Sequence, residues 1–146
     1  MVSVILPTFG SKEWLHECLE SIKTKDYKDL ELIVETDEGT GAAAARNRAL
    51  DKATGEYVLF CDSDDYMGPD AIDNLLRSID GVDMVCGSFR KFGDFDQTVS
   101  HFTKVMTMWE VAQYVMLNLL NPGQHQMLSG CWAKLFRRDK IGHFPN

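Results

Sequence analysis

Short apolar runs alternate with amphipathic stretches over the first 90 residues, and this alternation constrains the fold more than any other feature. The runs lie at residues 2–6, 30–34, 57–61 and 84–86, and most are rich in β-branched or aromatic side chains. The spacing of apolar side chains predicts helices over about 11–24, 42–53 and 69–79. Strands that alternate with helices form parallel sheets with right-handed crossovers. We therefore expect an α/β layered domain with a mainly parallel central sheet flanked by helices.

The rest of the chain is less regular. Apolar spacing predicts a helix over about 108–119, and short strands are expected near 98–102 and 131–136. A chain of 146 residues, 45% of them hydrophobic, suits one domain with its own core and is too short for two. We expect a single domain over residues 1–146.

Charge and cysteine usage exclude several classes of protein. The net charge of −7 argues against a surface that binds nucleic acid. No apolar run approaches the roughly 20 residues of a membrane helix, and the N-terminus lacks the basic front of a secretory signal. We expect no disulfide framework and no metal knuckle from the four widely spaced cysteines, Cys18, Cys61, Cys86 and Cys131. This composition predicts a reduced, cytoplasmic protein without a transmembrane segment.

Three carboxylates, Asp62, Asp64 and Asp65, directly follow the apolar run at 57–61. Like charges this close repel one another unless a cation binds there. Oxygen ligands in this D-x-D-D spacing suit Mg²⁺ or Mn²⁺, which bridge to substrate phosphates. The alternative is a turn in which Asp62 or Asp64 only caps the following helix. The expected position at the carboxyl edge of the sheet favours a ligand site.

The turn G-T-G-A-A-A, from Gly39 to Ala44, leads into a helix that carries Arg46. It matches the G-x-G-x-x-A form of a dinucleotide fingerprint, with Asp62 about 20 residues further on. That fingerprint normally follows the first strand, whereas a whole strand and helix precede it here. A nicotinamide dinucleotide site therefore competes with a diphosphate site in which Arg46 is the counter-charge, and a solvated Arg46 is the structural alternative. An aspartate-nucleophile phosphatase is less favoured, because its D-x-D belongs on the first strand.

Pro7, Thr8 and Phe9 end the first apolar run, at the edge of the sheet where Asp37 is also expected. Thr8 and a neighbouring carboxylate would hydrogen-bond a uracil ring or a ribose, with Phe9 or Tyr66 as an apolar wall. A simple turn into the next helix is the alternative for this segment taken alone.

Several segments, in the right order, resemble the inverting family 2 glycosyltransferases of GT-A fold. They are V-S-V-I-L-P-T-F-G at 2–10, W-L-H-E-C-L-E-S-I at 14–22, D-Y-K-D-L-E-L-I-V at 26–34, A-A-A-R-N-R-A-L at 43–50 and T-G-E-Y-V-L-F-C-D-S-D-D at 54–65. A weaker similarity covers W-A-K-L-F-R-R at 132–138. The resemblance implies a GT-A, Rossmann-like domain that binds a nucleotide-diphospho-sugar, usually a UDP-sugar, with Mn²⁺ or Mg²⁺. It also implies that residues 1–90 form the nucleotide-sugar-binding half and 91–146 part of the acceptor half.

Carried onto matching positions, the resemblance implies a nucleoside pocket at Pro7, Thr8 and Phe9, with Asp37 near the uracil. The family usually has a further helix and strand between its acidic turn and its A-A-R-N segment, whereas here only about eight residues separate Asp37 from that segment. Glu35 is therefore the alternative to Asp37 in the nucleoside role.

The same resemblance implies that Arg46 lies near the base or the diphosphate. Asp62 and Ser63 would lie near the ribose or the sugar, and Asp64, together with Asp62, would bind the metal. The implied reaction is displacement at the anomeric carbon with inversion, in which the metal and Arg46 offset charge on the leaving diphosphate.

The general base is where the sequence departs from the family pattern. Members typically carry an Asp after an F-P segment as the base for the acceptor hydroxyl, and this chain reads Phe144-Pro145-Asn146. His125, in a polar loop, is the alternative base. We expect a metal-dependent hexosyltransferase with a glycan or lipid-linked acceptor, or else a nucleotide-sugar-binding module without catalysis. The location would be cytoplasmic or peripheral at a membrane, and an oligomer is compatible with the sequence.

Overall fold

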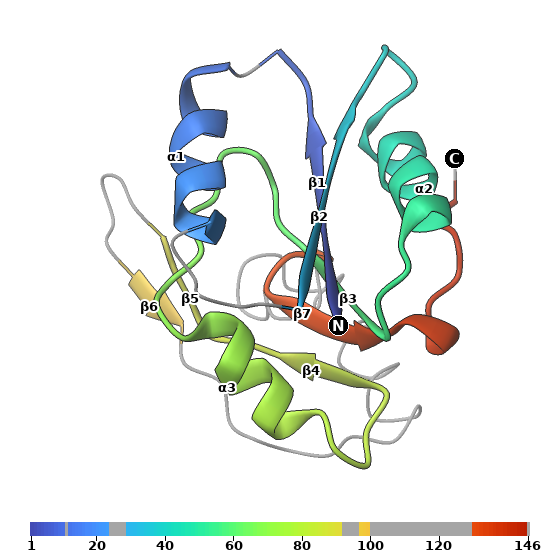
Figure 1. The fold of residues 1–146 in the computed structure, drawn as a ribbon. Coiled ribbons are helices and arrows are strands. Elements are labelled where there is room, and N and C mark those ends of the chain that lie inside the picture. Colours follow the sequence, from blue (N-terminus) through green and yellow to red (C-terminus); the bar gives the residue numbers. More distant parts are fainter. Residues whose placement is uncertain (11, 24–28, 92–96, 100–129, 146) are drawn as a thin grey trace, which may run out of the picture.

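The protein is represented by a computed structural model, which describes residues 1–10, 12–23, 29–91, 97–99 and 130–145. The first three strands and the helices between them follow the predicted order (Figure 1). In chain order, the elements are β1 (Val2–Thr8), α1 (Lys12–Lys23), β2 (Leu30–Thr36), α2 (Ala42–Lys52), β3 (Tyr57–Phe60), α3 (Ala71–Ser78), β4 (Met84–Cys86), β5 (Phe89–Lys91), β6 (Gln97–Val99), β7 (Lys134–Arg137) and a 3₁₀ turn (Arg138–Lys140).

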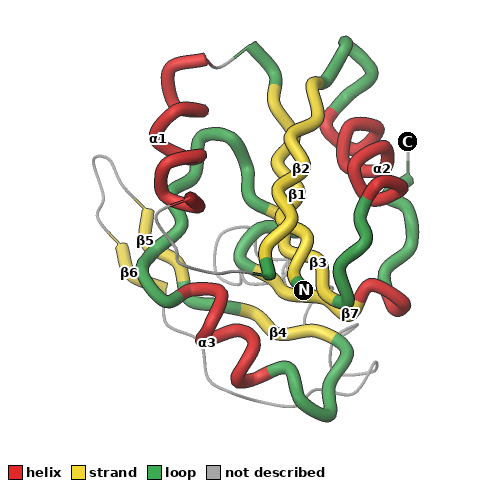
Figure 2. The backbone as a smooth tube through the Cα atoms, in the orientation of Figure 1, coloured by secondary structure: helices red, strands yellow, loops and turns green. Residues whose placement is uncertain are grey.

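The main sheet has the strand order β2-β1-β3-β7-β4. β1 pairs in parallel with β2 and β3, whereas β7 runs antiparallel to both β3 and β4. α1 and α3 lie on one side of the sheet and α2 lies on the other (Figure 2). The core residues of α1 and α3 belong to one apolar cluster, and those of α2 belong to a second one. The predicted α/β layered fold with a mainly parallel sheet flanked by helices is confirmed.

β1 is buried along its whole length. It has a strand on each side and helices over both faces, which explains why its sequence reads as a continuous apolar run rather than an alternating one. Its polar Ser3 is satisfied by Glu31, which accepts from the hydroxyl, and by the N–H of Gly55, which donates to it at 2.8 Å. A Cβ on Gly55 would lie 2.6 Å from that hydroxyl, so glycine is required there.

Two features of the second half differ from the sequence-based expectation. The strand expected over 131–136 corresponds to β7, which runs from Lys134 to Arg137. It lies between β3 and β4. The side chains of Leu135 and Phe136 account for the position of β7 inside the sheet, because they pack into the apolar clusters on its opposite faces. β5 and β6 form a separate antiparallel pair that was not predicted as such. The helix predicted over 108–119 lies outside the described residues.

Candidate functional site

An open cleft of about 260 Å³ lies where β1, β2 and β3 end, beside the first turns of α2. Its position agrees with the rule that ligands of such sheets bind at the carboxyl ends of the strands. Of the described residues that line it, all except Ala42 are among the predicted site residues. The lining consists of Pro7, Thr8, Phe9, Asp37, Ala42, Arg46, Asp62, Ser63 and Asp64.

β1 supplies one wall of the cleft. Thr8 is buried, whereas the Phe9 side chain, just beyond the end of the strand, is 69% exposed. The backbone carbonyl of Thr8 accepts the N–H of Asp37 at 2.7 Å, which ties the end of β1 to the residue that follows β2. A hydroxyl and an aromatic ring therefore stand next to a carboxylate, as expected for a pocket that holds a nucleoside.

The glycine turn between β2 and α2 is organised around the carboxylate of Asp37. Its Oδ1 accepts the backbone N–H groups of Gly39, Thr40 and Gly41, each at 2.9 Å. Gly39 and Gly41 have φ of 90° and 91°, a backbone region that favours glycine. In a dinucleotide fingerprint such amides face the pyrophosphate, but here a side chain of the protein accepts them. This geometry weighs against the nicotinamide dinucleotide alternative.

Arg46 points from the second turn of α2 to the end of β3. Its Nη2 donates to Asp62 Oδ1 at 2.6 Å, and the two side chains are only 18% and 28% exposed. Among the described residues, its buried Nε has no hydrogen-bond partner. Arg46 is therefore not the solvated surface residue of the structural alternative, and its ion pair orients a guanidinium at the cleft.

The three residues after Asp62 have different surroundings. Ser63 is buried, whereas Asp64 and Asp65 are exposed. The carboxyl of Asp65 is nonetheless partly desolvated, and this desolvation, with the negative charges of Asp62 and Asp64, raises its pKa to about 6. Repulsion between the carboxylates of this turn therefore adds to the effect of desolvation on Asp65.

The structure places three other candidates away from this cleft or outside its description. Glu35 lies on β2 and pairs with Arg48 at 2.9 Å and with Lys52 at 2.5 Å, two cations of α2. These hydrogen bonds lower the pKa of its carboxyl, and Glu35 does not line the cleft. Tyr66 is exposed but does not line the cleft either. His125 lies outside the described residues.

Ala42 is the one lining residue that the sequence did not suggest. It opens α2 directly after Gly41, and its small side chain leaves the mouth of the cleft open. The sequence feature that could have identified Ala42 is its position at the start of a helix that follows a strand end. Such positions face the ligand in layered α/β folds.

The donor set fits the divalent cation that the resemblance implies, because carboxylate oxygens are the ligands that Mg²⁺ and Mn²⁺ prefer. Asp64 and Asp62 both line the cleft. In the described part of the chain, no three His, Cys, Asp or Glu side chains are grouped so that they would hold a metal by themselves. Within the described residues, Asp62 and Asp64 are thus two carboxylates that would need further ligands to hold such a cation. Over the same residues, no helix has the length and apolarity needed to cross a bilayer.

Comparisons with known proteins agree with the fold. The model of the family described as glycosyl transferase family 2 matches residues 33–142. The glycosyltransferase GlyA of Streptococcus pneumoniae is 29% identical over 64% of this chain, which covers 17% of GlyA. The protein EpsH of Bacillus subtilis is 26% identical over 96% of this chain, which covers 48% of EpsH. The chain thus spans about half or less of the length of these relatives.

Among solved structures, the chain is similar to residues 1–349 of TarS from Staphylococcus aureus. The complex of TarS with UDP gives a TM-score of 0.73 at 23% identity, over 99% of this chain and 50% of that one. The complex with UDP-GlcNAc gives a TM-score of 0.70 at 24% identity and covers 48% of that chain. At this identity the likeness shows a shared GT-A fold.

Proposed function

Because the chain belongs to glycosyl transferase family 2, we propose that it binds a nucleotide-diphospho-sugar with uridine as its nucleoside, in the cleft described above. The observation that carries this proposal is the convergence of Thr8, Asp37, Arg46 and Asp64 at the carboxyl ends of three neighbouring strands. The complexes of TarS with UDP and UDP-GlcNAc, a similar fold, support the choice of uridine.

In this proposal the end of β1 holds the nucleoside. The hydroxyl of the buried residue Thr8 donates or accepts a hydrogen bond with uracil or ribose, and the carboxylate of Asp37 accepts one. The exposed ring of Phe9 covers the base. Asp37 uses Oδ1 for the glycine turn, and its other oxygen is the one proposed to bind the nucleoside. Glu35 takes no part, because its two oxygens are engaged by Arg48 and Lys52.

Charge balance supports a dependence on a divalent cation. Among the described residues, Asp37, Asp62 and Asp64 line the cleft with one guanidinium, that of Arg46, which already pairs with Asp62. A diphosphate would bring further negative charge into this excess of carboxylates, which repels it. Asp64 and Asp62 would hold Mn²⁺ or Mg²⁺ on the protein side, and phosphate oxygens and water would complete the coordination.

The proposed reaction is transfer of the sugar from the donor to an acceptor hydroxyl, with inversion at the anomeric carbon. The cation, when bound, offsets charge on the leaving diphosphate. Arg46 adds a fixed positive group whose orientation is set by Asp62 before the substrate arrives, so little reorganisation is needed. A glycan or a lipid-linked sugar is the acceptor that the family resemblance suggests, and the base for its hydroxyl is proposed to be His125 or a residue of a longer chain.

The described residues that line the cleft all belong to residues 1–90, which supports the division into a nucleotide-sugar-binding half and a partial acceptor half. The halves share one sheet, because β7 lies between β3 and β4. This arrangement favours donor binding by the chain itself, whereas transfer depends on the base and on the acceptor site. A nucleotide-sugar-binding module without catalysis is therefore the second candidate.

Isothermal titration of the chain with UDP, with and without Mn²⁺, tests donor binding. We expect binding that is tighter by at least about tenfold with Mn²⁺, because the cation removes the repulsion described above. Absence of binding in both titrations, for protein shown to be folded by circular dichroism, would overturn the proposal. Incubation with UDP-sugars and a panel of glycan acceptors then separates the two candidates, because only a transferase releases UDP.

A further inference from the structure

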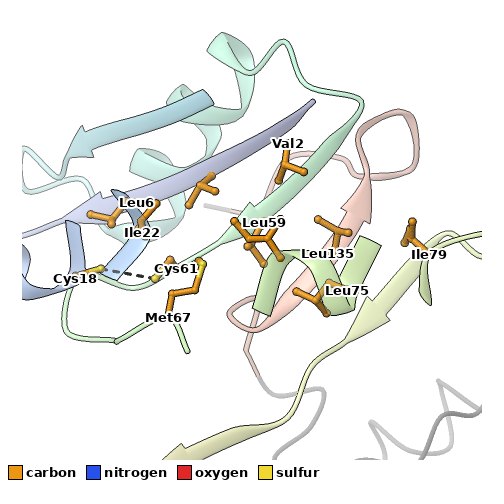
Figure 3. Packing of buried hydrophobic residues seen from close by; sticks show 12 residues of the cluster. Val2, Leu6, Cys18, Ile22, Leu59, Cys61, Met67, Leu75, Ile79 and Leu135 are labelled. Carbon is orange, nitrogen blue, oxygen red and sulfur yellow. Dashed lines mark hydrogen bonds between the residues drawn. The ribbon is translucent and has the colours of Figure 1, made fainter. Parts of the chain in front are cut away.

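Two buried cysteines lie in contact beneath the turn that carries the cleft carboxylates (Figure 3). Cys18 belongs to α1 and Cys61 directly follows β3, so they are 43 residues apart in the chain. Their Sγ atoms are 3.7 Å apart, and the residues are 1% and 5% exposed. A disulfide bond is about 2.05 Å long, so the sulfur atoms need to approach by roughly 1.7 Å to form one.

The same two thiols hold the start of residues 62–66, here called the acidic loop. The carbonyl of Asp62 accepts from Cys18 Sγ at 3.6 Å and from Cys61 Sγ at 3.7 Å. The carbonyl also accepts the backbone N–H of Asp65 at 3.0 Å, within the loop. One carbonyl therefore joins α1, the end of β3 and the acidic loop.

A second contact ties the other end of the acidic loop to α1. The N–H of Met67 donates to Ser21 Oγ at 3.0 Å, and that hydroxyl donates to the carbonyl of Cys18 at 2.6 Å. Met67 and Cys18 belong to one apolar cluster. Because α1 contacts both ends of the loop, a change at Cys18 reaches the residues that line the cleft.

We propose that Cys18 and Cys61 are a modification site, a thiol pair that a peroxide oxidises reversibly to a disulfide, and that this bond weakens nucleotide binding in the cleft. In the first step one sulfur attacks a peroxide oxygen and becomes a sulfenic acid, and water leaves. The second sulfur then attacks the first, the S–S bond forms, and a second water leaves. The two thiols lose two electrons and two protons, and hydrogen peroxide is reduced to two molecules of water.

The effect on binding follows from the contacts of Asp62 and rests on the proposed function. Oxidation removes both S–H donors from the Asp62 carbonyl and draws α1 toward the end of β3. The side chain of Asp62 pairs with Arg46 at 2.6 Å, and both line the cleft. A shift of the Asp62 backbone therefore changes the geometry of the carboxylate and the guanidinium that meet the donor.

The other two cysteines can be replaced to give a variant in which only the Cys18 and Cys61 thiols remain. Cys86 and Cys131 are free thiols and are less buried than the pair. In the described part of the chain, Cys18 and Cys61 make the one thiol–thiol contact at hydrogen-bonding distance. Replacing Cys86 and Cys131 with serine removes competing reactions and leaves the pair intact.

The experiment exposes the wild-type chain and the Cys86→Ser/Cys131→Ser variant to hydrogen peroxide and maps their peptides by mass spectrometry. We expect a peptide linked through Cys18 and Cys61, lighter by two hydrogen atoms and separated again by dithiothreitol. The affinity for UDP with Mn²⁺ should fall by about fivefold or more in the oxidised protein and recover on reduction. Adding Cys18→Ser to the double variant is the control, and peroxide should leave its affinity for UDP unchanged.

The peptide map and the UDP affinity test different parts of the proposal, so each part can be refuted by itself. If peroxide yields no linked peptide from folded protein, while the urea-unfolded chain still forms disulfides, the modification site is refuted. A linked peptide with unchanged affinity for UDP would refute the coupling to the cleft. If the reduced protein does not bind UDP, the proposed function fails, and the peptide map still decides whether the pair is oxidised.

Discussion

At the scale of single residues, Asp62 and Asp64 have different surroundings although they are two positions apart. Asp62 is half-buried and accepts a hydrogen bond from Arg46 with one oxygen, whereas Asp64 is exposed. A cation can therefore reach Asp64 without breaking a contact within the protein. For Asp62, the ion must share the carboxylate with the guanidinium. Asp64 is consequently the residue in which metal dependence is best tested.

We expect Asp64→Asn to abolish the gain in UDP affinity that Mn²⁺ provides. The amide keeps the size of the side chain but removes the negative charge that attracts the ion. Stability should change by no more than about 0.5 kcal/mol, because the residue is exposed. Titration calorimetry with and without Mn²⁺ measures the first effect and urea unfolding the second.

Asp83→Asn is the matched control, because it removes one exposed carboxylate that does not line the cleft. Its affinity for UDP should retain the full response to Mn²⁺. Should Asp64→Asn retain that response too, the acidic loop would be a structural turn, as in the capping alternative.

The buried Nε of Arg46 is a hydrogen-bond donor without a partner among the described residues. Leaving a buried donor unpaired costs on the order of 1 to 3 kcal/mol. A bound anion would recover that cost, since the guanidinium presents several donors to phosphate oxygens. The contact with Asp62 fixes the orientation of the guanidinium.

At the scale of elements, Glu35 links β2 to α2. Its carboxylate meets Arg48 and Lys52, and Arg48 also donates to the carbonyl of Thr36 at 2.8 Å. The Glu35 side chain is only 13% exposed, so its charge is partly shielded from water. Such a link stabilises the domain without touching the ligand.

We therefore expect Glu35→Gln to lower the free energy of unfolding by about 1 kcal/mol at neutral pH and to leave UDP affinity unchanged. Because Lys52 and Arg48 lower the pKa of Glu35, its contribution is complete above the ordinary pKa of a glutamate. It is lost as the pH falls through the lowered pKa. Urea unfolding of wild type and variant between about pH 7 and pH 3 should show the difference vanish in acid.

Asp37→Asn is the comparison for Glu35→Gln. It keeps an oxygen for the amides of the glycine turn, but an NH2 group replaces the second oxygen, which is proposed to accept a hydrogen bond from the nucleoside. UDP affinity should fall in this variant and not in Glu35→Gln. The opposite result would assign the nucleoside role to Glu35.

β7 is the element that joins the second half of the chain to the first. Its Leu135 is fully buried and belongs to the cluster formed with α1 and α3. Leu135→Ala should lower the free energy of unfolding by about 3 kcal/mol, because it leaves a cavity in a packed core. Urea unfolding measures this loss, and Lys140→Ala, an exposed change in the following turn, should alter stability little. A small loss for Leu135→Ala would show that β7 contributes little to the sheet.

At the scale of the whole molecule, the sequence predicted what depends on local patterns. β1, α1, β2, α2 and β3 follow from apolar spacing within short windows, and the carboxyl-edge rule brought Thr8, Asp37 and Asp62 together. The place of β7 was not predictable in this way, because it pairs with strands far away in the chain. Which of Glu35 and Asp37 lines the cleft also required the structure, since Glu35 pairs with two cations of α2 whereas Asp37 lies at the cleft.

The cleft joins parts of the molecule that are distant in sequence, and this gives a prediction for the stability of the whole domain. A ligand that binds only the folded state adds about 2.7 kcal/mol at a hundred times its Kd. For a domain of this size, that corresponds to a rise in Tm of roughly 5 to 10 °C. UDP with Mn²⁺ should give this shift in a thermal melt, because it would contact the ends of β1 and β3, the residue after β2 and the first turns of α2 together. Mn²⁺ alone and NAD with Mn²⁺ are the controls and should raise Tm far less, since neither supplies both a uridine and a diphosphate that fit the cleft. An equal shift with NAD would restore the dinucleotide alternative that the glycine turn first suggested.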